Sequence, residues 1–245
     1  MSHNRTMPTF AKTRQAEQAA LDWFRSAAAS RLMTVEQAEL IPALTSVHGS
    51  HALYLRPSAT ANSMLSGHLL GDVMSLHVRG DGGGWDGDLR CGAEGFPIED
   101  GSLALVYLLH SLDHCANPQR LLGEVMRMLQ PDGCLISVGL NPWSPWSWRW
   151  RGRGPIGRSA SRTARLIEQS GLTLLRSYRL GPLSPFDGAD LPRVPELHSS
   201  LSGGLRAGYA WCARKRVQSL TPDAKAARQR AQLMRGRTEA APNAG

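Results

Sequence analysis

Cysteine is scarce in this sequence of 245 residues, and the scarcity limits the ways in which the chain can be stabilised. The four cysteines lie far apart, and no two of them form a CxxC pair. They are too few for a disulfide scaffold and are wrongly spaced for a zinc site of four thiolates. We therefore expect reduced thiols, as in a cytoplasmic protein.

Long apolar segments are also missing. Charged residues interrupt every apolar run before it reaches the roughly 18 residues of a membrane-spanning helix. The first residues likewise lack the apolar core, about 7 to 15 residues long, of a secretory signal peptide. We expect no transmembrane segment and a cytoplasmic location.

Acidic residues are outnumbered, with 20 Asp and Glu against 28 Lys and Arg, which gives a formal net charge of +8. Most of the excess lies in residues 141–166, which contain six arginines and no acidic residue. The hydrophobic share of 42% excludes an intrinsically disordered chain. The composition is therefore that of a globular protein with one strongly basic segment.

The length indicates one domain with two extensions. Residues 1–40 are predicted to form a helical N-terminal extension, with an amphipathic helix over residues 15–32. Residues 41–220 form the expected domain. Residues 221–245 are basic, contain no aromatic side chain and are expected to be a disordered tail.

Short apolar runs alternate with helical patterns across the expected domain, which is typical of parallel βαβ units. Strands are predicted at residues 51–55, 73–78, 103–109, 134–140, 172–180 and 208–217, and helices at residues 59–70, at 117–129, and from Ser159 or Ser161 to residue 169. The run 103–109 is the strongest strand signal, because a continuous apolar run suits a strand buried on both faces. The connection over residues 181–205 is long enough to cover a site.

Residues 96–139 carry several short motifs in a fixed order, including LDH at 112–114, NP at 117–118 and QPDG at 130–133. Together they resemble the signature of class I S-adenosylmethionine (SAM)-dependent methyltransferases of the small-molecule type, in a bacterial branch of that family. The resemblance implies a Rossmann-like α/β fold with a doubly wound, seven-stranded, mostly parallel sheet and an antiparallel last strand. It also implies SAM as the cofactor, bound across the carboxyl ends of the first strands.

The first half of the sequence departs from the family pattern. The family has a GxGxG-like loop after the first strand, where a Cβ would block the cofactor, but residues 56–62 contain no glycine. The acidic residue that binds the ribose would lie between His77 and Asp81, and the family's DAE triplet is GAE at 92–94. By position, the resemblance implies cofactor contacts from Ser58, Ala59, Asp81, Ala93, Glu94 and Leu109.

His110 and His114 are one helical turn apart if a helix follows the strand at 103–109. Such a pair could bind a metal ion, but no third ligand is evident, and we expect no metal site. The resemblance puts this segment beside the cofactor and the substrate. Either histidine is therefore a candidate general base, since methyl transfer to oxygen or nitrogen can require proton removal near pH 7. The alternative is a packing and capping role.

Tryptophan and arginine alternate in residues 143–153. The position of this segment in the family favours a pocket wall, with Trp143 and Trp146 facing the acceptor. Packing of the tryptophans on the sheet edge, with arginines stacked over them, is an alternative. Contact with a membrane surface or a nucleic acid is less favoured.

These features predict methyl transfer from SAM to an unknown small or medium-sized acceptor. No nucleic-acid partner is expected. The alternative is a catalytically inactive protein with the methyltransferase fold, which uses the Trp/Arg-rich segment to bind a partner or ligand.

Overall fold

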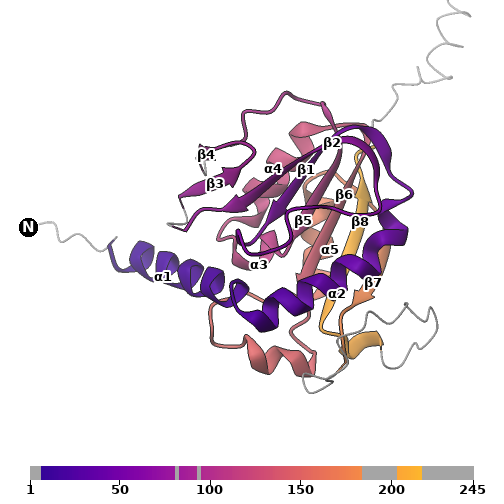
Figure 1. Ribbon diagram of the computed structural model, residues 1–245. Coiled ribbons are helices and arrows are strands. Elements are labelled where there is room, and N and C mark those ends of the chain that lie inside the picture. The colour runs from indigo at the N-terminus through magenta and orange to yellow at the C-terminus, as the bar shows by residue number, and fades with distance from the viewer. Residues whose placement is uncertain (1–6, 81–82, 93–94, 184–202, 217–245) are drawn as a thin grey trace, which may run out of the picture.

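The computed structural model describes residues 7–80, 83–92, 95–183 and 203–216 (Figure 1). The predicted tail at 221–245 lies outside these residues. The helices are α1 (Met7–Phe24), α2 (Ala27–Leu44), α3 (Ser111–His114), α4 (Pro118–Met128) and α5 (Ala160–Gln169), with short 3-10 helices η1 (Pro145–Arg149) and η2 (Gly203–Leu205). The strands are β1 (His48–Arg56), β2 (Leu69–Val78), β3 (Gly84–Gly87), β4 (Cys91–Gly92), β5 (Leu103–Leu109), β6 (Leu129–Leu140), β7 (Thr173–Leu180) and β8 (Gly208–Arg214).

The described strands form one mixed sheet in the order β4-β3-β2-β1-β5-β6-β8-β7. Strands β2, β1, β5 and β6 are parallel, and β8 is inserted antiparallel between β6 and β7. This confirms the predicted mixed α/β class with a largely parallel core and an antiparallel last strand. The sheet has eight strands instead of the expected seven, because residues 84–92 fold back on β2 as the antiparallel pair β3 and β4.

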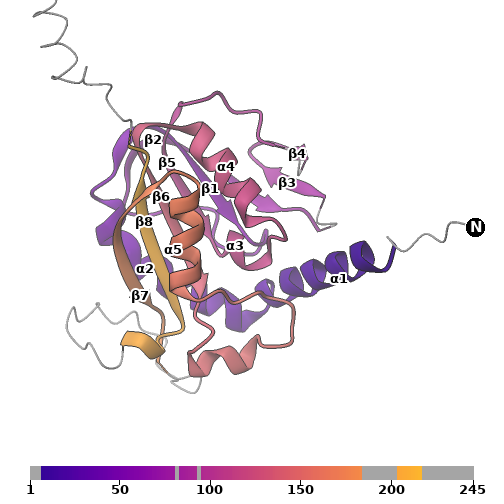
Figure 2. The same cartoon turned by 180° about the vertical axis from the view of Figure 1, so that it is seen from behind.

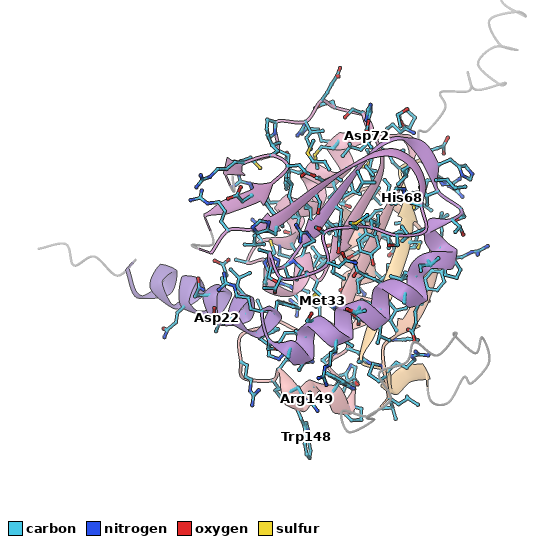
Figure 3. The ribbon with its side chains drawn as sticks, viewed as in Figure 1. Asp22, Met33, His68, Asp72, Trp148 and Arg149 are labelled. Carbon is cyan, nitrogen blue, oxygen red and sulfur yellow. The ribbon has the colours of Figure 1, made fainter. Side chains whose placement is uncertain are left out.

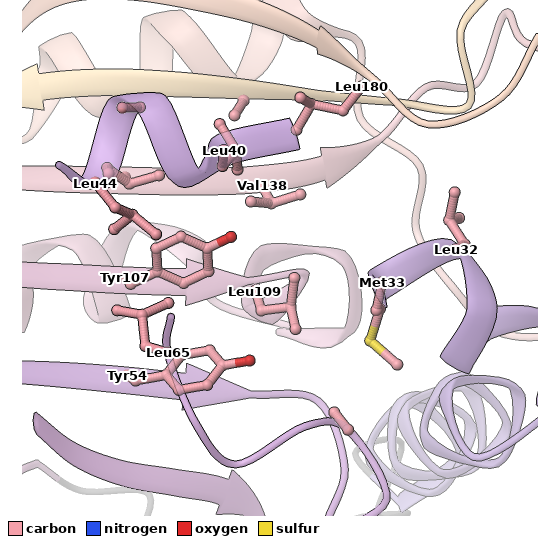
Figure 4. Close-up of a cluster of buried hydrophobic side chains, with 14 of the residues drawn as sticks. Leu32, Met33, Leu40, Leu44, Tyr54, Leu65, Tyr107, Leu109, Val138 and Leu180 are labelled. Atoms are coloured by element: carbon pink, nitrogen blue, oxygen red, sulfur yellow. The ribbon is translucent and has the colours of Figure 1, made fainter. Parts of the chain in front are cut away.

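Helices cover both faces of the sheet. Helix α2 packs on one face, where its leucines meet Tyr54 of β1 and Tyr107 of β5 in a closed apolar cluster (Figure 4). Helices α4 and α5 cover the opposite face, which Figure 2 shows from behind. Among the described residues, no helix is long and apolar enough to cross a membrane.

The N-terminal region forms two helices where the sequence predicts one over residues 15–32. The chain turns at Arg25 and Ser26, and the Ser26 hydroxyl caps α2 by accepting a hydrogen bond from the amide of Ala29 at 3.3 Å. Such a cap satisfies an amide that has no partner within the helix. The break lets the end of α1 cross the edge of the sheet beside α3 (Figure 1).

The predicted helix at 59–70 is wrong, because the described chain has no helix between β1 and β2. Buried Arg56 donates from Nη1 to the carbonyl of Ala61 at 2.6 Å, and the Asn62 side chain accepts from the amide of Met64 at 3.0 Å. Both bonds engage backbone groups that a helix would use. Ala61 and Leu65 are buried in the cluster under α2, so the segment covers the sheet without a helix.

Other boundaries lie close to the predictions. Strand β5 has the predicted limits, α4 begins after its Asn117 cap, and Ser159 caps α5. Strand β6 begins at Leu129 instead of residue 134, because Leu129 pairs with Leu103 across a register shift. Strand β8 ends at Arg214, three residues before the predicted end.

Candidate functional site

The carboxyl ends of β1, β2 and β5 meet at one edge of the sheet, which is the place where open α/β sheets generally bind ligands. The last turns of α1 cover this edge. Leu21 packs with Leu55 of β1, and Phe24, which is fully buried, packs with Leu109 of β5. The edge is therefore shielded from water by the N-terminal helix.

The turn after β1 is closely packed. Arg56 and Ser58 are buried, while Ala59 is exposed. The Ser58 hydroxyl lies 2.9 Å from Oγ1 of Thr60 and 3.5 Å from the carbonyl oxygen of Phe24. Ser58 thus joins the turn to the end of α1.

The end of β2 carries a neutral imidazole beside a cation. His77 lies opposite Arg56 in the β1–β2 register and opposite Asp86 in the β2–β3 register. Burial lowers the pKa of His77, and the nearby Arg56 lowers it further, so the ring is uncharged at neutral pH. Asp86 was missed by the sequence reasoning, since nothing in the sequence indicated that residues 84–87 return alongside β2.

Of the remaining four residues that are predicted to contact the cofactor, the structure describes one. Leu109 is fully buried in the cluster under α2. Asp81, Ala93 and Glu94 lie outside the described residues.

His110 is held between two carboxylates. It has a left-handed backbone conformation (φ 50°), which is uncommon for a residue with a side chain. Its Nε2 lies 2.7 Å from Oε2 of Glu36 on α2, and its Nδ1 lies 3.0 Å from Oδ2 of Asp113. The same Asp113 oxygen accepts a hydrogen bond from the amide of Leu140 at 2.8 Å. This cluster, the Glu36–His110–Asp113 triad, joins α2, the end of β5 and the end of β6.

The triad is buried, with all three side chains at most 1% exposed. Burial alone would lower the pKa of His110, but the charges and hydrogen bonds of Glu36 and Asp113 outweigh it and raise the pKa to about 9. Burial raises the pKa of Glu36, against the attraction of His110. His110 is therefore an imidazolium at neutral pH, and both of its nitrogens are occupied.

The ring of His114, in contrast to that of His110, carries no charge. It is buried beside the rings of Phe24 and Trp85, at centroid distances of 6.3 and 6.2 Å. Burial lowers its pKa to about 3, aided by the positive charges of His110 and Arg158. The ring is neutral, and its Nε2 is buried without a hydrogen-bond partner among the described residues. Within the described part of the chain, no group of three or more His, Cys, Asp or Glu side chains could hold a metal ion.

The two tryptophans predicted to face an acceptor lie in different surroundings. Trp146 is 8% exposed and belongs to the core cluster under α2. Trp143 is 74% exposed. Their predicted acceptor contacts stay predictions.

The polar atoms that the described residues offer at this edge differ from the glycine loop and the carboxylate of the family. Nε of Arg56, Nδ1 of His77 and Nε2 of His114 are all buried without a hydrogen-bond partner in the described part of the chain. Buried polar groups are rarely left unpaired, since each such group costs about 1 to 3 kcal/mol. A ligand with several hydrogen-bonding groups would satisfy these atoms.

Comparisons with known proteins agree with this fold. Residues 83–137 match the family model described as a methyltransferase domain. No curated protein matches the chain.

Three solved structures illustrate the likeness. The methyltransferase in complex with the Trm112 activator of Haloferax volcanii is 14% identical, with a TM-score of 0.57 over 81% of this chain and 98% of that one. A SAM-dependent methyltransferase from Thermotoga maritima is 14% identical, with a TM-score of 0.53 over 83% and 100%. Geranyl diphosphate C-methyltransferase from Streptomyces coelicolor, in complex with Mg²⁺, geranyl diphosphate and S-adenosyl-L-homocysteine (SAH), is 12% identical, with a TM-score of 0.51 over 86% and 100%. At these identities the likeness establishes the fold.

Proposed function

We propose that this chain, of which residues 83–137 match a methyltransferase domain, is a class I SAM-dependent methyltransferase that transfers a methyl group from SAM to a small or medium-sized acceptor. The observation that carries the proposal is the set of buried, unpartnered nitrogens of Arg56, His77 and His114 at the carboxyl edge of the parallel strands. They lie at the edge where this architecture binds its ligands.

Two of these nitrogens suit the cofactor. The guanidinium of Arg56 is a donor for the carboxylate of the methionine part, and neutral His77 offers Nδ1 to a ribose hydroxyl. His77 thereby takes the place of the acidic residue of the family, as an uncharged group. When bound, SAM supplies the electrophilic methyl group on its sulfonium.

The neighbouring side chains exclude water and hold protons in place. Phe24 covers the edge, which strengthens the electrostatic interactions beneath it. His110 is a fully bonded imidazolium and cannot take up a proton, while His114, with a pKa of about 3, is a hydrogen-bond acceptor but a weak base. These two histidines therefore favour an acceptor that is already nucleophilic at neutral pH. In-line positioning of such an acceptor can lower the activation free energy by roughly 7 to 11 kcal/mol.

The test is calorimetric titration of the full chain with SAM and with SAH. We expect both to bind to the wild-type protein. His77→Ala should weaken the binding of SAH about tenfold, the value of one buried hydrogen bond. The control His51→Ala changes an exposed histidine of the neighbouring strand β1, farther from the carboxyl edge, and should bind as the wild type does. Equal affinities in the wild type and His77→Ala would remove His77 from the site.

A second function is favoured by two observations. Phe24 stacks on the ring of His110 at 5.3 Å, and Arg56 stands where the family has bare backbone. These contacts suit a methyltransferase fold kept as a catalytically inactive scaffold. The same titration separates the two functions, because a scaffold gives no binding of SAM or SAH at millimolar concentration.

A further inference from the structure

We propose that one end of the molecule, formed by η1 and the segments beside it, docks on the surface of an anionic lipid bilayer. We call this end the aromatic–basic face. It consists of Trp143, Trp148, Arg151, Arg153, Leu183 and Leu205, all of them exposed. The proposal does not depend on SAM binding.

Buried side chains fix the segment that carries this face to the core of the molecule. Trp146 and Trp150 are 8% and 4% exposed and belong to the core cluster under α2. The indole of Trp23 on α1 donates to the carbonyl of Arg149 at 2.9 Å, and the Arg149 guanidinium lies 5.0 Å from the ring centroid of Trp146. Half of the tryptophans in the segment thus fix its conformation, and a partner would meet a preformed surface.

The other two tryptophans point outward. Trp143 is 74% exposed and Trp148 is 77% exposed, which is unusual for the largest apolar side chain. Figure 3 shows Trp148 projecting beyond the ribbon at this end of the molecule, next to Arg149. The side chain of Arg151 donates to the carbonyl of Pro142 at 3.1 Å, which keeps a basic residue beside Trp143. Indole rings next to basic side chains are typical of the interface between lipid headgroups and acyl chains.

Hydrogen bonds of Asn141 hold the segment that carries η1 beside the segment that carries η2. The amide of Asn141 donates to the carbonyl of Ala207, and its side chain donates to the carbonyls of Gly204 and Arg206 at 2.8 and 2.9 Å. Figure 2 shows η1, in pink, and η2, in orange, at the same end of the sheet.

Leu205 on η2 is 49% exposed, and Leu183 is 42% exposed. The amide of Ala207 donates to the carbonyl of Pro182, which brings Leu183 to the same strand end. Aliphatic side chains gain from entering the acyl region but have no ring to stack on nucleobases. The mixture of leucine and tryptophan therefore favours a bilayer over a single-stranded nucleic acid.

The charge of the segment complements an anionic surface. Arg149, Arg151 and Arg153 lie in η1 or just after it, and residues 141–166 contain no acidic residue. Basic residues near such a surface each contribute about 1 kcal/mol, and the contribution falls as salt screens the charges. Tryptophan insertion and arginine attraction are two separate signals, and stable membrane association generally takes two.

The test is co-sedimentation of the full chain with phosphatidylcholine vesicles and with vesicles that also contain about one third phosphatidylglycerol. We expect binding to the anionic vesicles that weakens as salt is raised. The double variant W143A/W148A should lose at least about tenfold in affinity, since it removes two indoles from the interface. The matched control M64A/L69A removes two side chains that are 73% and 62% exposed elsewhere, and should bind as the wild type does.

Far-UV circular dichroism and thermal melting establish that each variant is folded. Absence of wild-type binding to anionic vesicles would overturn the proposal, as would equal binding by W143A/W148A. Binding to a single-stranded oligonucleotide with the same tryptophan dependence, but not to vesicles, would assign the face to nucleic acid instead.

Discussion

The Glu36–His110–Asp113 triad predicts that the stability of the protein depends on pH in a way that one isosteric change removes. The pKa of His110 is raised from 6.5 to about 9, which corresponds to about 3 kcal/mol of preference for its protonated form in the folded chain. A group whose pKa is raised by folding contributes this stability fully below its unfolded pKa, near 6.5, and loses it as the pH rises through 9. The triad therefore stabilises the fold at neutral pH, and much less at pH 10.

Glu36→Gln keeps the shape of the side chain and removes its charge. At pH 6.5 the variant should lose about 3 kcal/mol of unfolding free energy, which is the usual cost of removing one partner from a buried ion pair. At pH 10, where His110 is neutral in the wild type as well, the difference should shrink to about 1 kcal/mol, the value of a neutral hydrogen bond. Urea unfolding at the two pH values measures both differences.

Glu39→Gln is the matched control. Glu39 lies on the same helix, is buried, and bonds to the amide of Gly181 at 2.9 Å and to the guanidinium of Arg206. Arginine keeps its charge over this range, so the cost of Glu39→Gln should be the same at both pH values. A cost of Glu36→Gln that also stays constant from pH 6.5 to pH 10 would refute the assignment of the charge to His110.

Two further changes test the surroundings of the triad. Folding lowers the pKa of His114 to about 3, so the wild type should lose stability as the pH falls from 6.5 towards 3. His114→Gln should reduce this loss by about 3 kcal/mol between pH 6.5 and 4. If urea unfolding gave the same loss of unfolding free energy in the variant as in the wild type, the burial of a neutral ring would be contradicted. A Cβ at Gly208 would collide with Oε1 of Glu36, so Gly208→Ala should lower the unfolding free energy by about 2 kcal/mol. The control Gly204→Ala, whose new Cβ has no atom of the described residues within 4 Å, should change it by no more than about 0.5 kcal/mol. Equal thermal melting of the two variants would show that the packing around Glu36 is different.

Elements with strong local signals could be predicted from the sequence. Strand β5 is a continuous apolar run, and all seven of its residues are buried. Helix α4 begins where Asn117 caps and Pro118 fixes the first turn, and α5 begins after Ser159. In each case the residues that determine the boundary lie within the element or next to it.

The connection between β1 and β2 could not be predicted in this way. Its conformation depends on Arg56, whose guanidinium reaches the carbonyl of Ala61, and on the burial of Ala61 and Leu65 under α2. Local helix propensity at 59–70 is overridden by these contacts. The contact with α2 joins parts of the chain that the sequence pattern does not connect.

The site shows the same limit. His110 could be singled out from the sequence, but its partner Glu36 lies 74 residues away on α2. One signal was available, because Glu36 stands one helical turn from Leu32 and from Leu40, both of which are buried. An acidic residue on the apolar stripe of a helix indicates a buried partner, although it does not identify that partner.

The most direct measurement of the central claim is a crystal structure of the full chain grown with SAH. We predict that the nucleoside lies at the carboxyl ends of β1, β2 and β5, with a ribose hydroxyl on Nδ1 of His77 and the carboxylate on Arg56. A structure grown at millimolar SAH in which Phe24, Arg56 and His77 keep their present contacts and no nucleoside lies at that edge would contradict methyl transfer at this site.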